Sequence, residues 1–334
     1  MQSSNVVKKS LAFLFAGILM AATPSGMAWG KTQDLVIFGD SLSDTGNRFF
    51  VAGIKNTPPY DLAAQDDLVP RFPYAIGGAT YTNGSIWIEH LARAISRGGV
   101  SQAALASNGT AANYAFAGAR ASNDPPIPFN DNLHLSKQVD RYLGDVNDVA
   151  SSTALFVIFI GGNDLAEALG ATLQGFPVGE QMVANAVGSV ASNVLLKLYP
   201  AGARRFLFVT APNIGNAPLF SQIPIPPPLP PNLASIVGAA FADGYNAGVQ
   251  ANVINALSGA GAEVHVLDGR GFFDEINDNP ADFGFANTSD HCIAPFEPPF
   301  QCKRPDTYVY WDNFHPTARV HELLGERAIQ LMAP

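Results

Sequence analysis

The sequence predicts an α/β fold in which a parallel β-sheet is covered by helices on both faces. After residue 33, short apolar segments alternate with longer segments of helical periodicity. The apolar segments are continuous rather than alternating, which is typical of strands buried on both faces. Polar and glycine-rich clusters follow three of them. Because sites in parallel sheets lie at the carboxyl ends of strands, we expect the chemistry there.

Four apolar segments are the expected strands. They cover residues 35–38, 155–160, 205–210 and 264–267. The second is rich in β-branched and aromatic side chains, which favour strands. Each of the first three ends at a polar cluster, so these three ends are the expected edge of a site.

Five segments have helical spacing of their apolar residues. They cover residues 86–95, 135–146, 183–198, 233–257 and 317–332. Three glycines weaken the helix propensity of the fourth. Residues 223–231, with the sequence IPIPPPLPP, cannot be helical, because proline lacks the N–H group. We expect a polyproline II segment there, either a stiff spacer or a rim of the substrate cleft.

Residues 1–30 are expected to be a cleaved secretory signal peptide. Lys8 and Lys9 precede an apolar run over residues 11–22, and small residues follow at 26–28. An N-terminal membrane anchor is the alternative, although the run is shorter than the ~20 residues of a typical span. We therefore expect a secreted or periplasmic protein with no stable membrane span.

The composition is that of an acidic globular protein. Hydrophobic residues make up 47% and charged residues 14% of the 334 residues, and the formal net charge is -9. Nucleic acid is not an expected partner, because its binding depends on Lys and Arg. The same charge does not favour binding to an anionic membrane surface.

Cys292 and Cys302 are expected to form a disulfide, because an exported protein enters an oxidising compartment. Two free thiols or a metal site are the alternatives. A metal site is disfavoured, because the sequence has no C-x-x-C spacing.

Ser41 is the candidate nucleophile, in the motif GDSLSDTGN at residues 39–47. A serine hydroxyl needs an adjacent base, an orienting partner for that base, and donors for the oxyanion. Ser41 is expected where a helix begins, so an ordinary helix N-cap is the alternative. Asp40, Ser43 and Asp44 are expected to hold its loop.

His315 is the candidate base, in the motif WDNFHPT at residues 311–317. Asp312 precedes it by three residues and can bind one ring nitrogen, which leaves the other to accept a proton. Pro316 is expected in the first turn of the C-terminal helix. A local capping interaction is the alternative. The other five histidines are expected to be surface or core residues.

Two glycine-containing clusters offer hydrogen-bond donors. Asn163 lies in GGND, residues 161–164, after the second strand, and Gly118 lies in NYAFAGAR, residues 113–120. A side-chain amide and a closely approachable main-chain N–H could stabilise an oxyanion. A glycine turn with an Asn cap and a packed strand end are the respective alternatives.

These four blocks, in this order, resemble the GDSL or SGNH hydrolase family. Residues 82–89, TNGSIWIE, also resemble an early segment of that family, and the resemblance covers about residues 34–331. Similar members include plant GDSL lipases and bacterial secreted esterases and phospholipases. The resemblance implies a three-layer, flavodoxin-like fold for one domain over residues 31–334, with no metal or other cofactor.

The resemblance also implies roles for individual residues. Ser41 is the nucleophile, His315 the base and Asp312 its orienter. The oxyanion hole comprises the main-chain N–H groups of Ser41 and Gly118 and the side chain of Asn163. Ala117 stands where many members have another glycine.

The expected function is hydrolysis of carboxylic esters through an acyl-enzyme. A phospholipase or an acyltransferase with the same triad is the alternative, as is an exported binding protein on an inactive scaffold. We expect a monomer whose substrate is a small-molecule or lipid ester.

A medium-chain, lipid-like ester is the expected substrate, because apolar residues follow the nucleophile block and the third strand. They are Phe49, Phe50, Val51, Ile54, Pro58, Pro59, Tyr60 and residues 220–231. If they only pack on the core, a small cleft for short-chain esters remains. Arg48 and Arg120 could contact a phosphate, which leaves a phospholipid open.

Overall fold

The computed structural model describes residues 34–52, 78–95, 102–107, 112–123, 133–293 and 301–333. The predicted signal peptide at residues 1–30 lies outside the described residues. So do Ile54, Pro58, Pro59 and Tyr60.

A parallel sheet of four strands forms the centre of the molecule and confirms the predicted fold class. The strands are β1 (Leu35–Gly39), β2 (Leu155–Phe159), β3 (Arg205–Val209) and β4 (Glu263–Leu267), in that spatial order. Leu35 lies opposite Leu155, which in turn lies opposite Arg205. The carboxyl ends of β1 and β2 therefore meet at one edge, where Gly39 pairs with Phe159.

An irregular segment, residues 112–116, extends the sheet beyond β1. The Ile37 N–H donates to the Ala112 carbonyl at 2.8 Å, and the Tyr114 N–H donates to the Ile37 carbonyl at 2.8 Å. With this segment included, the sheet order is 112–116, β1, β2, β3, β4, the flavodoxin-like order. The order of strands reverses between β1 and β2, where such sheets place their ligand crevice.

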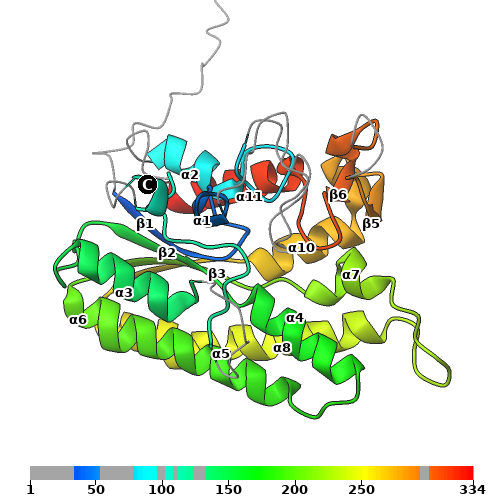
Figure 1. Cartoon of the computed structure of the whole chain (residues 1–334), viewed down its shortest axis with the longest axis horizontal. Helices are drawn as coiled ribbons and strands as arrows, with labels where there is room; N and C mark the ends of the chain where they lie inside the picture. The colour runs from blue at the N-terminus through cyan, green and yellow to red at the C-terminus, as the bar shows by residue number, and fades with distance from the viewer. Residues whose placement is uncertain are drawn as a thin grey trace, which may run out of the picture.

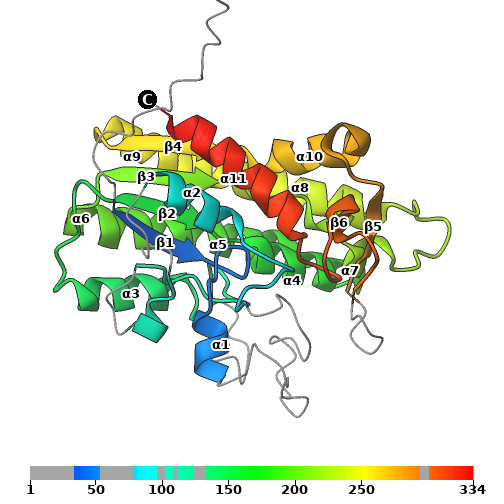
Figure 2. The ribbon, with the colours of Figure 1, turned by 90° about the horizontal axis from the view of Figure 1, so that it is seen from above.

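Helices cover both faces of the sheet, because alternate strand residues are buried in two separate cores. Val36, Phe38 and Phe156 belong to the core on one face, and Leu35 and Ile37 to the other. The first face is covered by α3 (Leu135–Asp145), α4 (Gly162–Leu173), α5 (Gly179–Asn193) and α8 (Leu233–Val249). The second is covered by α2 (Trp87–Ile95), α10 (Gly269–Asp278) and α11 (Ala318–Met332). Figures 1 and 2 show this three-layer arrangement.

The predicted helices are confirmed, and two of them continue through a π-helical turn. After α5 come η2 (Val194–Leu198) and α6 (Tyr199–Ala201); after α8 come η4 (Gln250–Ile254) and α9 (Asn255–Gly259). Gly238 does not break α8 but lets it approach a neighbouring turn, since a Cβ there would lie 2.8 Å from the Gly215 nitrogen.

The helices α4 and α10 and several short elements were not predicted from the sequence. The short elements are α1 (Asn47–Ala52), η1 (Leu105–Ser107), η3 (Ile214–Asn216), α7 (Pro218–Ser221), η5 (Pro280–Phe283), β5 (Asn287–His291), η6 (Pro305–Thr307) and β6 (Tyr308–Tyr310). None of the described helices is long and apolar enough to cross a membrane.

The start of α11 differs from the prediction. Its N-cap is Thr317, so Pro316 lies before the helix and pairs with Tyr310 in an isolated bridge. The Thr317 hydroxyl donates to the Tyr308 carbonyl instead of capping α11. Asn83, 235 positions earlier, supplies the acceptor, since its Oδ1 takes a hydrogen bond from the Ala318 N–H at 2.8 Å. An N-terminal loop thus fixes the C-terminal helix.

His321 anchors α11 to α2 in the core. The side chain is 2% exposed, and its Nδ1 accepts a hydrogen bond from the Trp87 N–H at 3.4 Å. Burial lowers the pKa of His321 to about 3, with smaller contributions from His315 and His90. His134 is also a core residue, and its Nδ1 accepts from the Arg120 N–H at 3.0 Å.

We expect His321→Gln to change how stability depends on pH. The native imidazole stays neutral down to about pH 3, whereas the unfolded chain takes up its proton near pH 6.5. The unfolded state then binds more protons, so the wild type should lose about 1.4 kcal/mol per pH unit relative to the variant between pH 6 and 4. Urea unfolding of both proteins at pH 8, 6, 5 and 4 measures this. A stability difference that is the same at every pH would contradict it.

Candidate active site

Ser41 lies in a tight turn directly after β1. The N–H groups of Ser43 and Asp44 both donate to the Asp40 carbonyl, at 3.1 and 2.9 Å. The next helix, α1, begins only at Asn47, so the expectation that Ser41 marks a helix start is wrong. Ser41 is 4% exposed and lines a pocket at the carboxyl edge of the sheet.

His315 lies beside this serine, and Asp312 lies beside His315. His315 Nε2 lies 2.8 Å from Ser41 Oγ, and His315 Nδ1 lies 2.7 Å from Asp312 Oδ2. Asp312 Oδ1 accepts from the main-chain N–H groups of Phe314 and His315, at 2.7 and 2.6 Å. The carboxylate is therefore fixed by its own loop, and it orients the imidazole with one nitrogen directed at the hydroxyl.

A disulfide joins Cys292 and Cys302 and supports the loop that carries His315. The Cys292 and Ile293 N–H groups donate to the Trp311 carbonyl, at 3.1 and 2.8 Å. The Trp311 N–H donates to the His315 carbonyl at 2.8 Å. The bridge thus reaches the imidazole loop through two layers of main-chain hydrogen bonds.

Asn163 and Gly118 lie on adjoining loops at the same edge. Asn163 is the second residue of α4, and its Nδ2 donates to the Ala119 carbonyl at 2.7 Å. This bond ties the amide to the residue after Gly118. Gly161, the N-cap of α4, has a φ of 114°, and Gly118 has a φ of 75°, so both turns require the left-handed region that favours glycine.

Two buried carboxylates hold the Gly118 loop from either side. Asp44 Oδ2 accepts from the Ala117 N–H at 2.9 Å. Asp164 accepts from the Ala121 and Ser122 N–H groups at 2.7 and 3.0 Å. Burial raises the pKa of Asp44 to about 6 and that of Asp164 to about 7, and these hydrogen bonds partly oppose the effect.

Asp40 and Ser43 also hold the nucleophile loop. Asp40 Oδ1 accepts from the Leu42 N–H at 3.0 Å, and burial raises the pKa of Asp40 to about 6. Ser43 Oγ accepts from the indole N–H of Trp87 at 3.2 Å. Both contacts fit the supporting roles predicted for these side chains.

Two residues that support the site were not identified from the sequence. Gln138, on α3, accepts from the Gly39 N–H at 3.0 Å and donates to the Gly39 carbonyl at 2.8 Å, so it pairs with the end of β1. Tyr245, on α8, donates to the Ile160 carbonyl at 2.8 Å, and its ring leaves no room for a Cβ at Gly161. Each is a single polar residue in a helix, and no motif marked either one.

The pocket beside Ser41 has mostly apolar walls. Among its lining side chains are Phe159, Ile214, Ala217, Phe273, Tyr310 and Phe314. Arg48 and Arg120 are not among its described lining residues. Arg120 is buried and forms an ion pair with Glu167 at 2.8 Å, and the buried Arg48 guanidinium lies over the Phe116 ring. Neither guanidinium is therefore placed in this pocket, where a substrate phosphate would need it.

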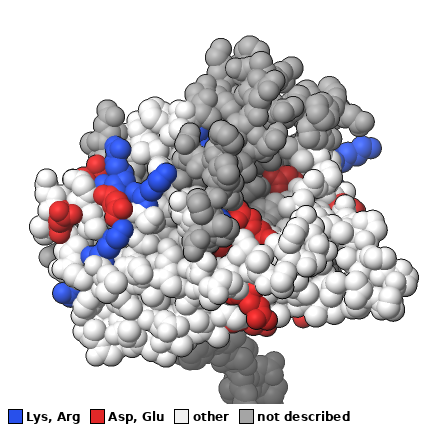
Figure 3. Space-filling view, turned by 60° about the horizontal axis from the view of Figure 1, so that its bottom comes forward, with Lys and Arg blue, Asp and Glu red and all other residues white. Residues whose placement is uncertain are grey.

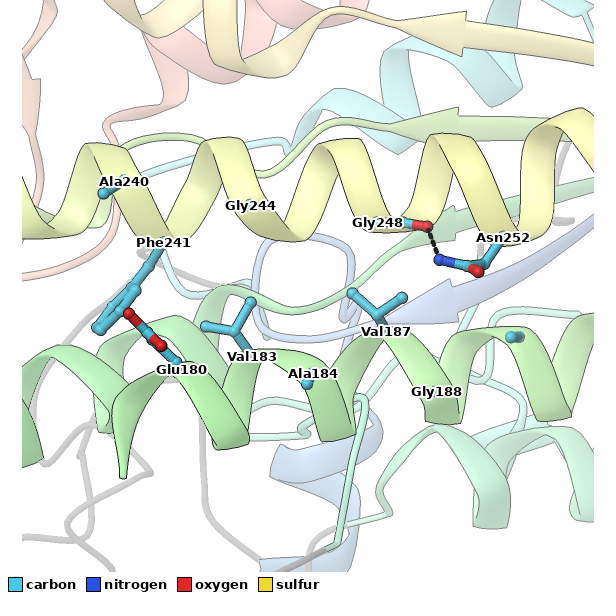
Figure 4. A pocket seen from close by; sticks show the side chains of 11 residues that line it. Glu180, Val183, Ala184, Val187, Gly188, Ala240, Phe241, Gly244, Gly248 and Asn252 are labelled. Atoms are coloured by element: carbon cyan, nitrogen blue, oxygen red, sulfur yellow. Dashed lines mark hydrogen bonds between the residues drawn. The ribbon is translucent and has the colours of Figure 1, made fainter. Parts of the chain in front are cut away.

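A larger groove, of about 680 Å³, lies between α5 and α8, away from this pocket. Its lining includes small residues such as Ala184, Gly188, Gly244 and Gly248, and Figure 4 shows the two helices facing each other across it. None of the candidate catalytic residues lines it. Among the described residues, no group of three His, Cys, Asp or Glu side chains is placed to hold a metal ion.

We expect Cys292→Ser combined with Cys302→Ser to loosen the imidazole loop selectively. The bridge spans only ten positions, so its loss should cost about 3 kcal/mol or less in global stability. Amide hydrogen exchange should accelerate in residues 301–317, whereas β1, β2 and β3 should remain protected. Equal acceleration throughout the sheet would contradict a local role.

Comparison with known proteins identifies a family for the chain. The model of the GDSL-like lipase/acylhydrolase family matches residues 35–328. A GDSL esterase/lipase of Arabidopsis thaliana is 24% identical over 90% of this chain and 82% of its own length. Lipase 1 of Photorhabdus luminescens is 23% identical over 96% of this chain and 53% of its own length.

Thermolabile hemolysin of Vibrio parahaemolyticus is also similar, at 23% identity over 90% of this chain and 64% of its own length. The match to the family model includes all four strands of the sheet and every candidate site residue. The chain therefore belongs to the GDSL-like lipase/acylhydrolase family and is a carboxylic ester hydrolase.

Proposed function

We propose that this protein is an exported serine hydrolase that cleaves carboxylic esters through an acyl-enzyme on Ser41. The observation that carries the proposal is the contact of 2.8 Å between His315 Nε2 and Ser41 Oγ, with Asp312 bound to the other ring nitrogen. The N-terminal charge and apolar pattern and the disulfide support export.

In the proposed mechanism, Ser41 Oγ attacks the ester carbonyl while its proton passes to His315 Nε2. The negative oxygen of the tetrahedral intermediate is bound by the N–H groups of Ser41 and Gly118 and by the amide of Asn163. Collapse breaks the bond to the alcohol, which takes the proton from His315. Water then attacks the acyl-enzyme with His315 again as base, and the acid and free Ser41 are released.

The apolar pocket supports an aliphatic acyl group as the substrate part bound beside Ser41. Phe159, Phe273 and Phe314 provide its aromatic walls, and no Lys or Arg is among its described lining residues. An acyl chain would exchange water for these side chains, at about 0.8 kcal/mol per CH₂ buried. We propose medium-chain, lipid-like esters as substrates, with an acyl chain that extends beyond this pocket, whose volume is about 40 Å³.

Ser41→Ala should reduce ester turnover by at least about 10³-fold, because the variant lacks the bond-forming oxygen. Hydrolysis of a chromogenic ester measures this, and an organophosphate should label Ser41 stoichiometrically in the wild type. Ser192→Ala is the matched control, since Ser192 is exposed and its hydroxyl donates to the Gly188 carbonyl within α5. It should keep most of the activity. Labelling at Ser43, or an active Ser41→Ala protein, would refute the assignment.

Asn163→Ala should lower kcat by about 10²–10³-fold with little change in KM, the usual loss for one oxyanion donor. Steady-state kinetics on one ester separates the two constants. Asn193→Ala, which removes a buried amide on α5 bound to Ser189, controls for general loss of packing. A higher KM at unchanged kcat would instead make Asn163 a residue that binds the ground state.

kcat/KM should rise several-fold for every two carbons added to the acyl chain beyond butyrate, because each CH₂ buried against apolar side chains beside Ser41 contributes to binding of the transition state. A series of 4-nitrophenyl esters at concentrations below aggregation measures this. A steep decline beyond butyrate would show a small cleft for short-chain esters.

A further inference from the structure

An exposed apolar loop projects from the molecule between α7 and α8. We call residues 222–231 the proline loop. Nearly all of it is exposed, including Ile223 at 36% and Leu229 at 50%. No charged residue occurs between Arg205 and Asp243 in the sequence. Figures 1 and 2 show the loop extending beyond the helices at the end that carries α7.

The base of this loop lies at the catalytic pocket. Ala217, just before α7, lines the pocket with Ser41. The Leu219 N–H donates to the carbonyl of Asn313 at 2.8 Å, and Asn313 directly follows Asp312. Gln222 donates from Nε2 to the Ser289 carbonyl at 2.9 Å. The loop is thus anchored to the segments that surround the candidate site.

The two ends of the loop are tied together. Asn213 Nδ2 donates to the Ser235 carbonyl at 3.0 Å, and the Ser235 hydroxyl donates to Asn216 Oδ1 at 2.6 Å. Gly215 touches the main chain of Ala234 so closely that a Cβ would overlap its carbonyl oxygen. These contacts hold the two ends of the proline loop next to each other.

The chemistry of the loop suits a water-poor environment. Six of the nine residues at 223–231 are prolines, which carry no N–H group to desolvate. Of the remaining three, Ile223 donates its N–H to the Phe220 carbonyl and Leu229 donates to the Pro226 carbonyl, both at 3.2 Å. Unpaired main-chain N–H and C=O groups are both costly in hydrocarbon, and the proline loop has few unpaired N–H groups.

We propose that the proline loop inserts into the surface of a lipid aggregate and so brings the pocket onto its substrate. The partner is a neutral or zwitterionic lipid surface, because the loop has no charge and the chain carries a net charge of -9. Figure 3 shows one face of the molecule, on which most of the visible Lys and Arg lie at the left, a further one lies at the upper right, and the lower right is mostly uncharged. The proposal rests on the proposed function only for the identity of the substrate.

Binding is tested first, without turnover. The probe is a vesicle of dialkyl-ether phosphatidylcholine, which has no ester to hydrolyse, and binding is measured by flotation. The variant combines Ile223→Asp and Leu229→Asp. The control is Leu196→Asp, which adds a charge at a side chain that is 74% exposed in η2, next to α6 at the opposite end of the molecule. The loop variant should bind at least tenfold more weakly than wild type, and the control within twofold of it.

Turnover is then compared for one ester in two physical states. On the dispersed monomer, the loop variant should match the wild type within twofold; on the emulsion, it should be at least tenfold slower. Absence of wild-type binding to the vesicles would overturn the proposal, as would equal losses in both states. Retention by an immobilised polyproline-binding domain without vesicle binding would favour a protein partner instead. If no ester is hydrolysed at all, the proposed function fails, yet the flotation result still decides this inference.

Discussion

The carboxylate of Asp44 is the interaction on which the geometry of the candidate site depends. It is buried and accepts hydrogen bonds of 2.6–3.1 Å from four main-chain N–H groups: those of Gly46, Asn47, Arg48 and Ala117. Three of these donors belong to the loop after β1 and its helix, and the fourth precedes Gly118. One side chain therefore joins the nucleophile loop to a candidate oxyanion loop. Four donors compensate a carboxylate that burial alone would make costly.

Much of the fold could be predicted because burial on both faces leaves a clear sequence signal. The run at residues 155–160 predicted β2 for this reason, whereas the segment at 112–116, which extends the sheet beyond β1, was not predicted as a strand. The start of α4 was not predicted, because the helix begins at Gly162, inside a glycine cluster with poor helix propensity. The position of Pro316 was predicted wrongly, because the local sequence does not show that the side chain of Asn83 accepts a hydrogen bond from the first N–H group of α11.

The candidate site was predicted where motifs place several polar residues close together in sequence. Ser41 and the Asp312 to His315 loop are examples, and their hydrogen bonds agree with the expected pairing. Gln138 and Tyr245 were missed, because their partners are main-chain atoms set by tertiary packing. The burial of Arg120 and its ion pair with Glu167 were not predicted either, because the two residues are 47 positions apart and no motif links them.

The wide separation of Ser41 and His315 has a consequence for biosynthesis. The two residues are 274 positions apart, and β4 ends at Leu267, so the whole sheet is synthesised before the imidazole. Contacts of such high sequence separation form only after a costly loop closure. In the proposed mechanism, a nascent chain therefore carries a nucleophile without its base. In that mechanism, hydrolysis begins only after the loop that carries His315 has docked beside β1, so topology itself delays its onset.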